Sequence, residues 1–244
     1  MRSILSSTLV TSLLVLVGCA SGGGTVGLSV QAVSDTTDPA LDFVDDGGVV
    51  YGVQTATLNL RNIEIDLPDG MVCADIAGQL SGPAVCDDSP GSSDKIRIQG
   101  PFVIDLVAGT STPTLDDVRI PAGVYKRIDF RVDPNAADES LGLTADFTHM
   151  GTDYLLDLSL AFNEDIRIED PAGIELTPDT DLMADLVLDT WLAGVDLGAC
   201  IEANEVDIVG TTVVVTDSSA TGACSGIEDT IKTNMKTSGQ LDKQ

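Results

Sequence analysis

The sequence is poor in histidine, with His149 as its one representative among 244 residues. A serine or cysteine nucleophile needs a base within hydrogen-bond reach, usually histidine, and no Gly-x-Ser-x-Gly motif accompanies this one. The same count excludes zinc, copper and haem sites built on several histidines. We therefore predict no catalytic residue and a protein that is not an enzyme, with His149 in a loop or at a strand end.

Basic and aromatic residues are scarce as well. Lys and Arg number 12 against 39 Asp and Glu, which gives a formal net charge of −27 at pH 7. A domain with this charge repels nucleic acid and anionic lipid headgroups, so we expect no nucleic-acid partner. Aromatic residues are only 4 % of the chain, although one or two exposed rings suffice to bind a glycan. The single tryptophan, Trp191, is expected in the core.

Long apolar runs are missing after residue 17, so the remaining sequence offers no stretch of the roughly 20 residues that a spanning helix needs. The one earlier run covers residues 4–17, with Arg2 before it and Gly18 after it. A basic residue, a short apolar segment and a small residue before the cut are the parts of an export signal. Residues 1–18 are therefore predicted to be a signal peptide, with an uncleaved anchor as the alternative.

The end of this segment, Leu16-Val17-Gly18-Cys19, resembles the lipobox of bacterial lipoproteins. In that family the peptide is cut before the cysteine, which is then acylated. The resemblance implies that Cys19 carries lipid and that the chain is exported and held at a membrane. The Ser- and Gly-rich residues that follow predict a flexible tether, so that residues 19–24 comprise the lipidated cysteine and this tether. Ala20 in place of an aspartate implies the outer membrane if the source has two. An ordinary signal peptide with an accidental cysteine is the alternative.

Four further cysteines follow Cys19, and an even number in an exported chain predicts disulfides. No C-x-x-C motif is present to support a metal site instead. Proximity in the sequence suggests one bond between Cys73 and Cys86 and another between Cys200 and Cys224.

Apolar residues alternate with polar ones in short segments between turns rich in Gly, Pro and Asp, which predicts an all-β sandwich. A parity change at Asn62 predicts a β-bulge. In the clearest strand, Val124 and Ile128 are expected to face inward and Tyr125 outward. Strands are expected at residues 25–33, 53–67, 95–107, 124–132, 143–147, 154–162, 182–192 and 206–215, with a hairpin around 170–173 between 164–168 and 173–176.

Helix signals are few. Residues 182–192 fit a strand by alternation, although a helix beginning near Thr180 is the alternative. Ile227, Ile231 and Met235 recur at a spacing of four residues, which predicts a short amphipathic helix. We expect one elaborated sandwich domain over residues 25–235 and a frayed tail over residues 236–244.

Three segments, TLNLRNIEID, FVIDLV and VRIPAGVYKRIDFRV, resemble a family of exported bacterial lipoprotein domains of unknown function. The resemblance covers residues 25–135, and Ile120-Pro121-Ala122-Gly123-Val124-Tyr125 is its most specific part, similar to an LPAGxYxxIRL signature. It implies an immunoglobulin- or transthyretin-like antiparallel β-sandwich and supplies no activity. The chain departs from the family at Phe130, where the signature carries leucine, and in its cysteine loop at 73–86.

Calcium is the cofactor that the acidic residues would suit, because hard oxygen ligands are abundant. None of the candidate groups matches the D-x-[DN]-x-[DN]-G-x5-E loop, and a solvated turn is the alternative for each. The groups are Asp35, Asp38, Asp42, Asp45 and Asp46; Asp133, Asn135, Asp138 and Glu139; and Asp179, Asp181 and Asp185.

The sequence predicts an envelope protein that acts by display or by binding through an acidic β-sandwich surface, with an envelope protein or a glycan as its partner. One alternative is a calcium- or glycan-binding module, and another is a hydrolase that uses two carboxylates. The basic residues Lys95, Arg97, Lys126, Arg127 and Arg131 could bind an anionic partner, or they could pair with carboxylates across strands.

Overall fold

The computed structural model describes residues 25–34, 41–89, 93–178 and 180–244. The predicted signal peptide, Cys19 and its tether lie outside these residues, as do Asp35, Asp38 and Asp179. The described chain is all-β and sandwich-like, as predicted. None of its helices is long and apolar enough to cross a membrane.

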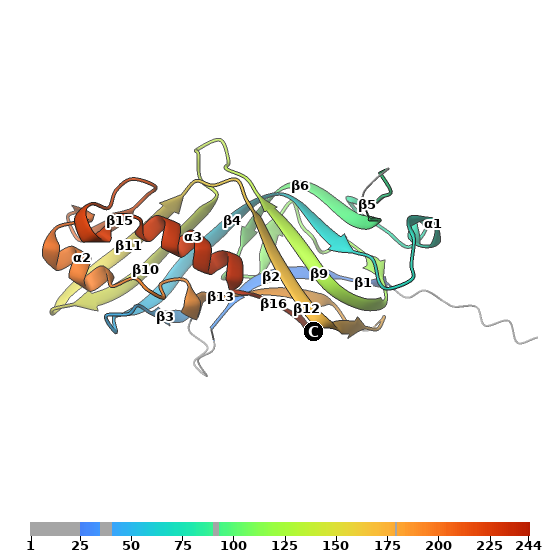
Figure 1. Cartoon of the computed structure of the whole chain (residues 1–244), viewed down its shortest axis with the longest axis horizontal. Helices are drawn as coiled ribbons and strands as arrows, with labels where there is room; N and C mark the ends of the chain where they lie inside the picture. Colours follow the sequence, from blue (N-terminus) through green and yellow to red (C-terminus); the bar gives the residue numbers. More distant parts are fainter. Residues whose placement is uncertain (1–24, 35–40, 90–92, 179) are drawn as a thin grey trace, which may run out of the picture.

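Eleven strands form the main sheet, whose central path runs β12-β9-β4-β10-β11-β15-β14. Figure 1 shows an elongated molecule with β10, β11, β15 and α2 at one end and α1, β5 and β1 at the other. The strands are β3 (Asp42–Val44), β4 (Val50–Asp66), β5 (Ala84–Asp87), β6 (Lys95–Asp105), β7 (Thr110–Thr112), β9 (Gly123–Val132), β10 (Leu141–His149), β11 (Thr152–Leu160), β12 (Asp165–Leu176), β14 (Asp207–Val209) and β15 (Thr212–Val215).

Two smaller sheets complete the fold. β2 (Leu28–Val33), β13 (Leu182–Val187) and β16 (Gly239–Lys243) form one, and β1 (Thr25–Val26) pairs with β8 (Ile120–Pro121) in the other. The apolar faces of these sheets and of the main sheet share one hydrophobic core. The helices are α1 (Cys73–Ile76), α2 (Leu197–Ala203) and α3 (Ile227–Thr237), with 3-10 turns at Leu188–Thr190 and Gly222–Cys224.

The long strand β4 organises the main sheet. One of its edges pairs with β3 and then β6, and the other pairs first with β10 and then with β9. The register shifts between Leu60 and Asn62 on both edges, which confirms the predicted bulge. Leu58 and Leu60 are buried before the bulge and Ile63 and Ile65 after it, so the extra residue keeps both apolar sets in the core.

The Pro-Ala-Gly-x-Tyr segment turns the chain into β9. The hydroxyl of Tyr125 donates a 2.6 Å hydrogen bond to the carbonyl oxygen of Pro121, and the tyrosine is fully buried. This bond back to a carbonyl a few residues upstream resembles the tyrosine corner of β-sandwiches. The predicted orientation of Tyr125 was therefore wrong, and Val124 is exposed instead. The alternation restarts at Ile128, because the register with β12 is irregular beside Lys126.

Four other expectations need correction. Residues 164–176 do not form a hairpin, because both halves of β12 pair with β9 around a register shift. Residues 206–215 form the β14–β15 hairpin, with Gly210 in its turn at φ 67°, rather than one bent strand. The sandwich is not purely antiparallel, because β2 pairs in parallel with β13, and β11 with β15. The tail is not frayed, because β16 pairs along β13 and buries Leu241.

Other expectations are confirmed. The disulfides are Cys73–Cys86 and Cys200–Cys224. Trp191 is buried, and its indole N–H donates to Ser238 Oγ. Helix α3 buries Ile227, Ile231 and Met235. Residues 182–187 form a strand, and the chain then changes to a 3-10 turn.

Helix α2 had no counterpart among the predicted elements. Its N-cap residue Asp196 accepts a hydrogen bond from the Ala199 N–H, and Asn204 ends it in the left-handed conformation at φ 56°. Both are recognised cap residues, so the sequence carried the signal.

Candidate functional site

Six of the 12 Lys and Arg residues lie on the outer face of β4, β6, β9 and β12. Alternation explains the arrangement, because the residues between them, such as Ile63, Ile98 and Phe130, are fully buried in the core. We call this surface the charged face. Its cations are Arg61, Lys95, Arg97, Arg127, Arg131 and Arg167, and its carboxylates are Glu64, Asp66, Asp129, Asp165 and Glu169, with Asp87 from β5.

Glu64 holds one side of the charged face together. Its carboxylate accepts a 2.7 Å bond from Lys95 Nζ and a 2.9 Å bond from Arg97 Nη2. Arg97 also reaches Asp87 at 2.7 Å. Burial acts to raise the pKa of Glu64, but the hydrogen bonds and charges of Lys95 and Arg97 outweigh it and lower the pKa below its ordinary value.

Asp129 holds the other side. It is 8 % exposed and accepts bonds from Arg127 Nη2 at 2.5 Å and Arg167 Nε at 2.9 Å. The bond to Asp129 raises the pKa of Arg127. Arg131 bonds to Asp165 at 3.0 Å and to Asn163 at 2.7 Å. Pairing with carboxylates therefore accounts for all five basic residues that the sequence had offered as anion ligands, since Lys126 is paired with Asp69.

Arg61, which the sequence did not single out, is the one cation of the charged face without a carboxylate partner in the part of the chain that the structure describes. It is the extra residue of the β4 bulge and has no pairing partner in β6 or β9. Among the Lys and Arg residues that the structure describes, its exposed side chain alone makes no hydrogen bond or ion pair. Bulges re-aim side chains and are frequent beside binding sites. A Cβ on Gly100 would lie 2.8 Å from the Arg61 carbonyl oxygen, so glycine permits this close approach.

Three polar atoms near Arg61 are buried without a hydrogen-bond partner. They are Oδ1 of Asn62 and the Nε atoms of Arg127 and Arg131. A buried polar atom without a partner costs about 1–3 kcal/mol. The three residues line one hollow of about 280 Å³ together with Arg61. The three atoms themselves have almost no surface open to the hollow, so it is the remaining guanidinium N–H groups of the lining that face it.

Arg61 also lines two more hollows. The second, of about 290 Å³, has polar walls made by Asn62, Glu64, Arg97 and Gln99. The third, of about 350 Å³, lies on the other side of the bulge against the loop after β9. Its apolar walls are Leu60, Pro101, Phe102, Val103, Pro134 and Ala136.

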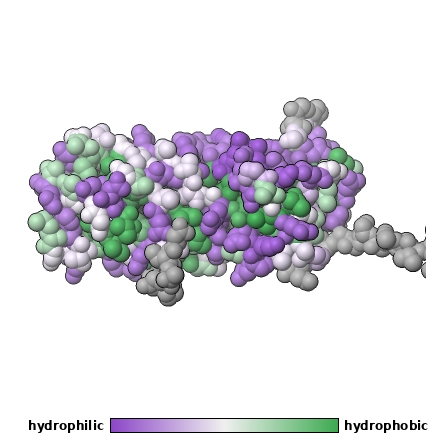
Figure 2. All heavy atoms as spheres, turned by 60° about the horizontal axis from the view of Figure 1, so that its bottom comes forward, coloured by the Kyte–Doolittle hydropathy of each residue, from purple (hydrophilic) through white to green (hydrophobic). Residues whose placement is uncertain are grey.

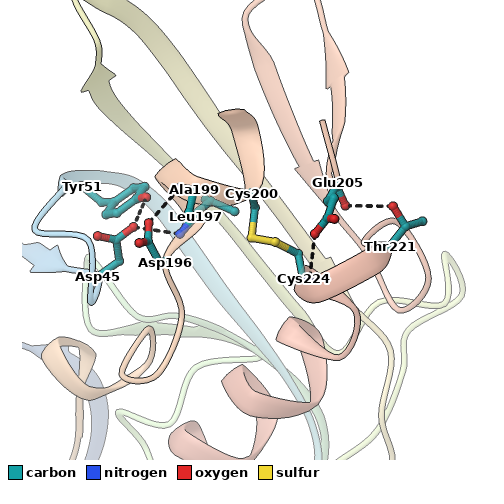
Figure 3. Close-up of a disulfide and its surroundings, with 9 residues drawn as sticks. All are labelled: Asp45, Tyr51, Asp196, Leu197, Ala199, Cys200, Glu205, Thr221 and Cys224. Atoms are coloured by element: carbon teal, nitrogen blue, oxygen red, sulfur yellow. Dashed lines mark hydrogen bonds between the residues drawn. A yellow bond between two sulfur atoms is a disulfide. The ribbon is translucent and has the colours of Figure 1, made fainter. Parts of the chain in front are cut away.

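The calcium candidates do not assemble into a site among the described residues. Asp45 is 5 % exposed and accepts a hydrogen bond from the Val49 N–H. It also accepts hydrogen bonds from the Tyr51 hydroxyl and the Leu197 N–H (Figure 3). This carboxylate therefore joins the β3–β4 turn to the start of α2. Burial, together with the nearby charge of Asp45, raises the pKa of Tyr51.

The other candidate groups likewise bond to the chain. Asn135 accepts bonds from the Ala137 and Glu139 N–H groups, Asp133 accepts one from Asn163, and Asp181 accepts one from the Gly27 N–H. No group of three or more His, Cys, Asp or Glu side chains within the described ranges is placed to hold a metal ion.

His149 lies at the end of β10, as expected, against α2. Its Nε2 is 3.1 Å from Glu202 Oε1, and a Cβ on Gly198 would collide with its ring. The contact therefore joins the β10–β11 hairpin to the helix that the Cys200–Cys224 disulfide also holds (Figure 3).

A separate, open hollow of about 700 Å³ lies at the end of the molecule that carries the β10–β11 tip. A row of aromatic rings crosses four strands beside it, from Phe43 through Tyr51 and Phe147 to Tyr154, with centroids 4.7–5.4 Å apart. Phe147 and Tyr154 line the hollow together with Asp146, Thr148 and Asp153.

Comparisons with known proteins assign no family. No family model matches the chain, and no curated protein matches it. Among solved structures, MbnP from Methylosinus trichosporium matches with a TM-score of 0.35 and 10 % sequence identity, over 82 % of this chain and 81 % of that one. The site is therefore interpreted from its own geometry.

Sequence reasoning missed Arg61, Asn62 and Arg167 as site residues. The parity change at Asn62 was the available signal, because it located the bulge that re-aims Arg61. The parity change could not show that Arg61 lacks a carboxylate partner, because the ion pairs of the charged face join residues from four strands.

Proposed function

We propose that this is an exported, lipid-anchored envelope protein that binds an anionic molecule at Arg61, without catalysis. Two disulfides are typical of exported proteins. The lipobox resemblance at Cys19 supports the anchor. The unpaired guanidinium of Arg61 carries the proposed binding activity.

Arg61 matters for anion binding because it is the one cation of the charged face whose charge no carboxylate of the described residues compensates. Six cations on the charged face stand beside six carboxylates, and five of the cations are paired with them. In a chain of net charge −27, an anion is repelled at long range and needs a local positive site. Arg61 offers a guanidinium fork, which matches the oxygens of a carboxylate, sulfate or phosphate.

Binding fits this geometry better than hydrolysis by paired carboxylates. A general acid needs a raised pKa, whereas Lys95 and Arg97 lower the pKa of Glu64. Both oxygens of Asp129 already accept arginine hydrogen bonds, so neither is free to act on a substrate.

The test is calorimetric titration of the mature chain, residues 19–244 with Cys19→Ser, with sulfate and phosphate at constant ionic strength. We expect saturable binding that Arg61→Gln weakens 10- to 100-fold, as removal of a charge-assisted hydrogen bond predicts. Lys126→Gln is the matched control, because it removes one exposed positive charge, paired with Asp69, at another place. Equal affinity in all three proteins, or no saturable binding, would overturn the proposal.

Anchoring has a separate test. Metabolic labelling with palmitate should mark the full chain, and Cys19→Ser should abolish the label. An unlabelled wild-type chain would leave an exported protein without a lipid anchor.

A glycan-binding module is the second candidate, favoured by the stacked rings of Phe147 and Tyr154 beside Asp146 and Asp153. Glycan-array binding should then fall at least tenfold in Tyr154→Ala and persist in Met150→Ala, which truncates an exposed side chain at the hairpin tip. Equal binding by both variants would rule out this hollow.

A further inference from the structure

We infer that the anion bound at Arg61 is amphiphilic: a small organic acid whose charged head meets Arg61 and whose apolar body fills the hollow between Pro101 and Pro134. This inference rests on the proposed anion site and names its ligand class. It is carried by the placement of one unpaired cation between polar and apolar hollows.

The apolar hollow has walls that offer few polar contacts. Pro101 and Pro134 lack a backbone N–H, and Val103 and Ala136 present only carbon from their side chains. Asn59, Asp133 and Asn135 are the polar residues that line it beside Arg61. Val103 is 44 % exposed on the outer face of β6. A volume of about 350 Å³ lies at the lower end of the range for small-molecule sites.

The loop that closes the apolar hollow is held in place by its own hydrogen bonds. The Asp133 N–H donates to the Asn59 carbonyl at 3.2 Å, and Asn59 Nδ2 donates to the Glu139 carbonyl at 3.0 Å. Asn135 uses its side-chain oxygen within the loop, on the Ala137 and Glu139 N–H groups. The wall is therefore formed before a ligand arrives. The Asp133 carboxylate, which also lines the hollow, accepts a hydrogen bond from Asn163.

The opposite side of Arg61 suits the head of such a ligand. There the hollows of about 280 and 290 Å³ have polar linings and share Arg61, Asn62 and Glu64. A carboxylate on Arg61 neutralises the one unpaired guanidinium of the face. An alkyl or aryl group placed here would remove water from charged side chains, which costs free energy. The same group gains free energy when it is buried against the apolar hollow instead.

The experiment titrates the mature Cys19→Ser chain with sulfate, acetate, hexanoate and octanoate at constant ionic strength, below micelle-forming concentrations. Octylammonium is the ligand control with the opposite charge. We expect Kd to fall about two- to fourfold per added methylene from acetate to octanoate, because each buried methylene contributes to binding until the hollow is full. Arg61→Gln should weaken octanoate binding at least tenfold.

Val103→Asn removes part of the apolar wall at an exposed position, and Val85→Asn makes the same change on β5, outside the three hollows. Both variants should melt within a few degrees of the parent. We expect Val103→Asn to lose the dependence on chain length while it keeps sulfate binding, and Val85→Asn to behave as the parent.

The outcomes separate the two proposals. Saturable sulfate binding with equal affinity for acetate and octanoate would keep the anion site and overturn the amphiphilic ligand. Octylammonium binding as tight as octanoate binding, or an unchanged chain-length dependence in Val103→Asn, would also overturn it. Absence of binding by every anion would overturn both.

Discussion

Asp185 is a buried carboxylate whose charge is only partly compensated. It is 3 % exposed in the central strand of the three-stranded sheet, and its Oδ1 has no hydrogen-bond partner. Burial raises the pKa of Asp185, the charge of Asp242 adds to the increase, and a hydrogen bond from Gln31 opposes it. The folded protein therefore holds this proton more tightly than the unfolded chain does.

From this we predict that Asp185→Asn stabilises the protein at pH 7. Because the pKa of Asp185 is raised in the folded state, the protein loses stability as pH rises from the ordinary aspartate pKa near 4 through the raised pKa of the folded protein. The variant should gain about 1 kcal/mol, or roughly 2–4 °C in Tm, at pH 7 and nothing at pH 3.5. Thermal melts at both pH values measure this, with Asp207→Asn, at an exposed position of β14, as control. An Asn variant that melts lower at pH 7 would contradict it.

Tyr125 shows how one hydroxyl fixes a turn. Tyr125→Phe keeps the buried ring but removes the hydrogen bond to the Pro121 carbonyl, which would stay buried without its partner. We expect a loss of about 1–3 kcal/mol in the free energy of unfolding, measured by urea titration. Tyr154→Phe is the control, because that tyrosine is only partly buried and its hydroxyl makes no hydrogen bond within the described chain. Equal losses would contradict a special role for Tyr125.

At the scale of elements, the bulge in β4 decides the architecture. Before it, the sheet continues through β10 and β11, and after it through β9 and β12. The loop between β9 and β10 leaves the sheet at the bulge, which creates the apolar hollow beside Arg61. A single extra residue thus positions both halves of the proposed binding site.

The C-terminal strand makes a second testable point. Leu241 is 9 % exposed where β16 pairs with β13, so Leu241→Ala should destabilise the protein by about 2–3 kcal/mol. Lys243→Ala, in the same strand but exposed, should change stability by less than about 0.5 kcal/mol. Urea denaturation followed by circular dichroism measures both. If Leu241→Ala left the free energy of unfolding unchanged, the C-terminal strand would not be stably paired with β13.

At the scale of the whole molecule, charge and apolar surface are both distributed unevenly. On the face drawn in Figure 2, hydrophobic residues form separate patches between hydrophilic ones rather than one continuous band. Cations gather on the charged face, and a formal net charge of −27 leaves excess carboxylates elsewhere. Repulsion among these carboxylates opposes the compact state.

We therefore predict that Tm rises with NaCl, by about 3–6 °C between 20 and 300 mM, because the Debye length shortens from about 20 to 6 Å. Arg61→Gln should rise in parallel, which separates general screening from occupation of the anion site. Differential scanning calorimetry measures both. A Tm that falls with salt would mean that attractive pairs on the charged face outweigh the repulsion.

Several features of the fold could be predicted from patterns within a single segment of the sequence. Alternation located most strands and the bulge at Asn62, and the four-residue spacing of Ile227, Ile231 and Met235 located α3. The two disulfides join cysteines that are neighbours in sequence, separated by 13 and 24 residues. In each case the information lies within one segment, where the hydrophobic effect or a short loop fixes the outcome.

The sequence by itself therefore determined the fold class, most of the buried faces and the disulfides. Only the tertiary structure decided that β16 completes a sheet with β13, that Tyr125 turns inward, and that Arg61 is left without a carboxylate. The physical reason is that these outcomes depend on neighbours far along the chain: Glu64 pairs with Lys95, 31 residues away. Periodicity tells each strand which face to bury, but packing and topology choose its neighbours.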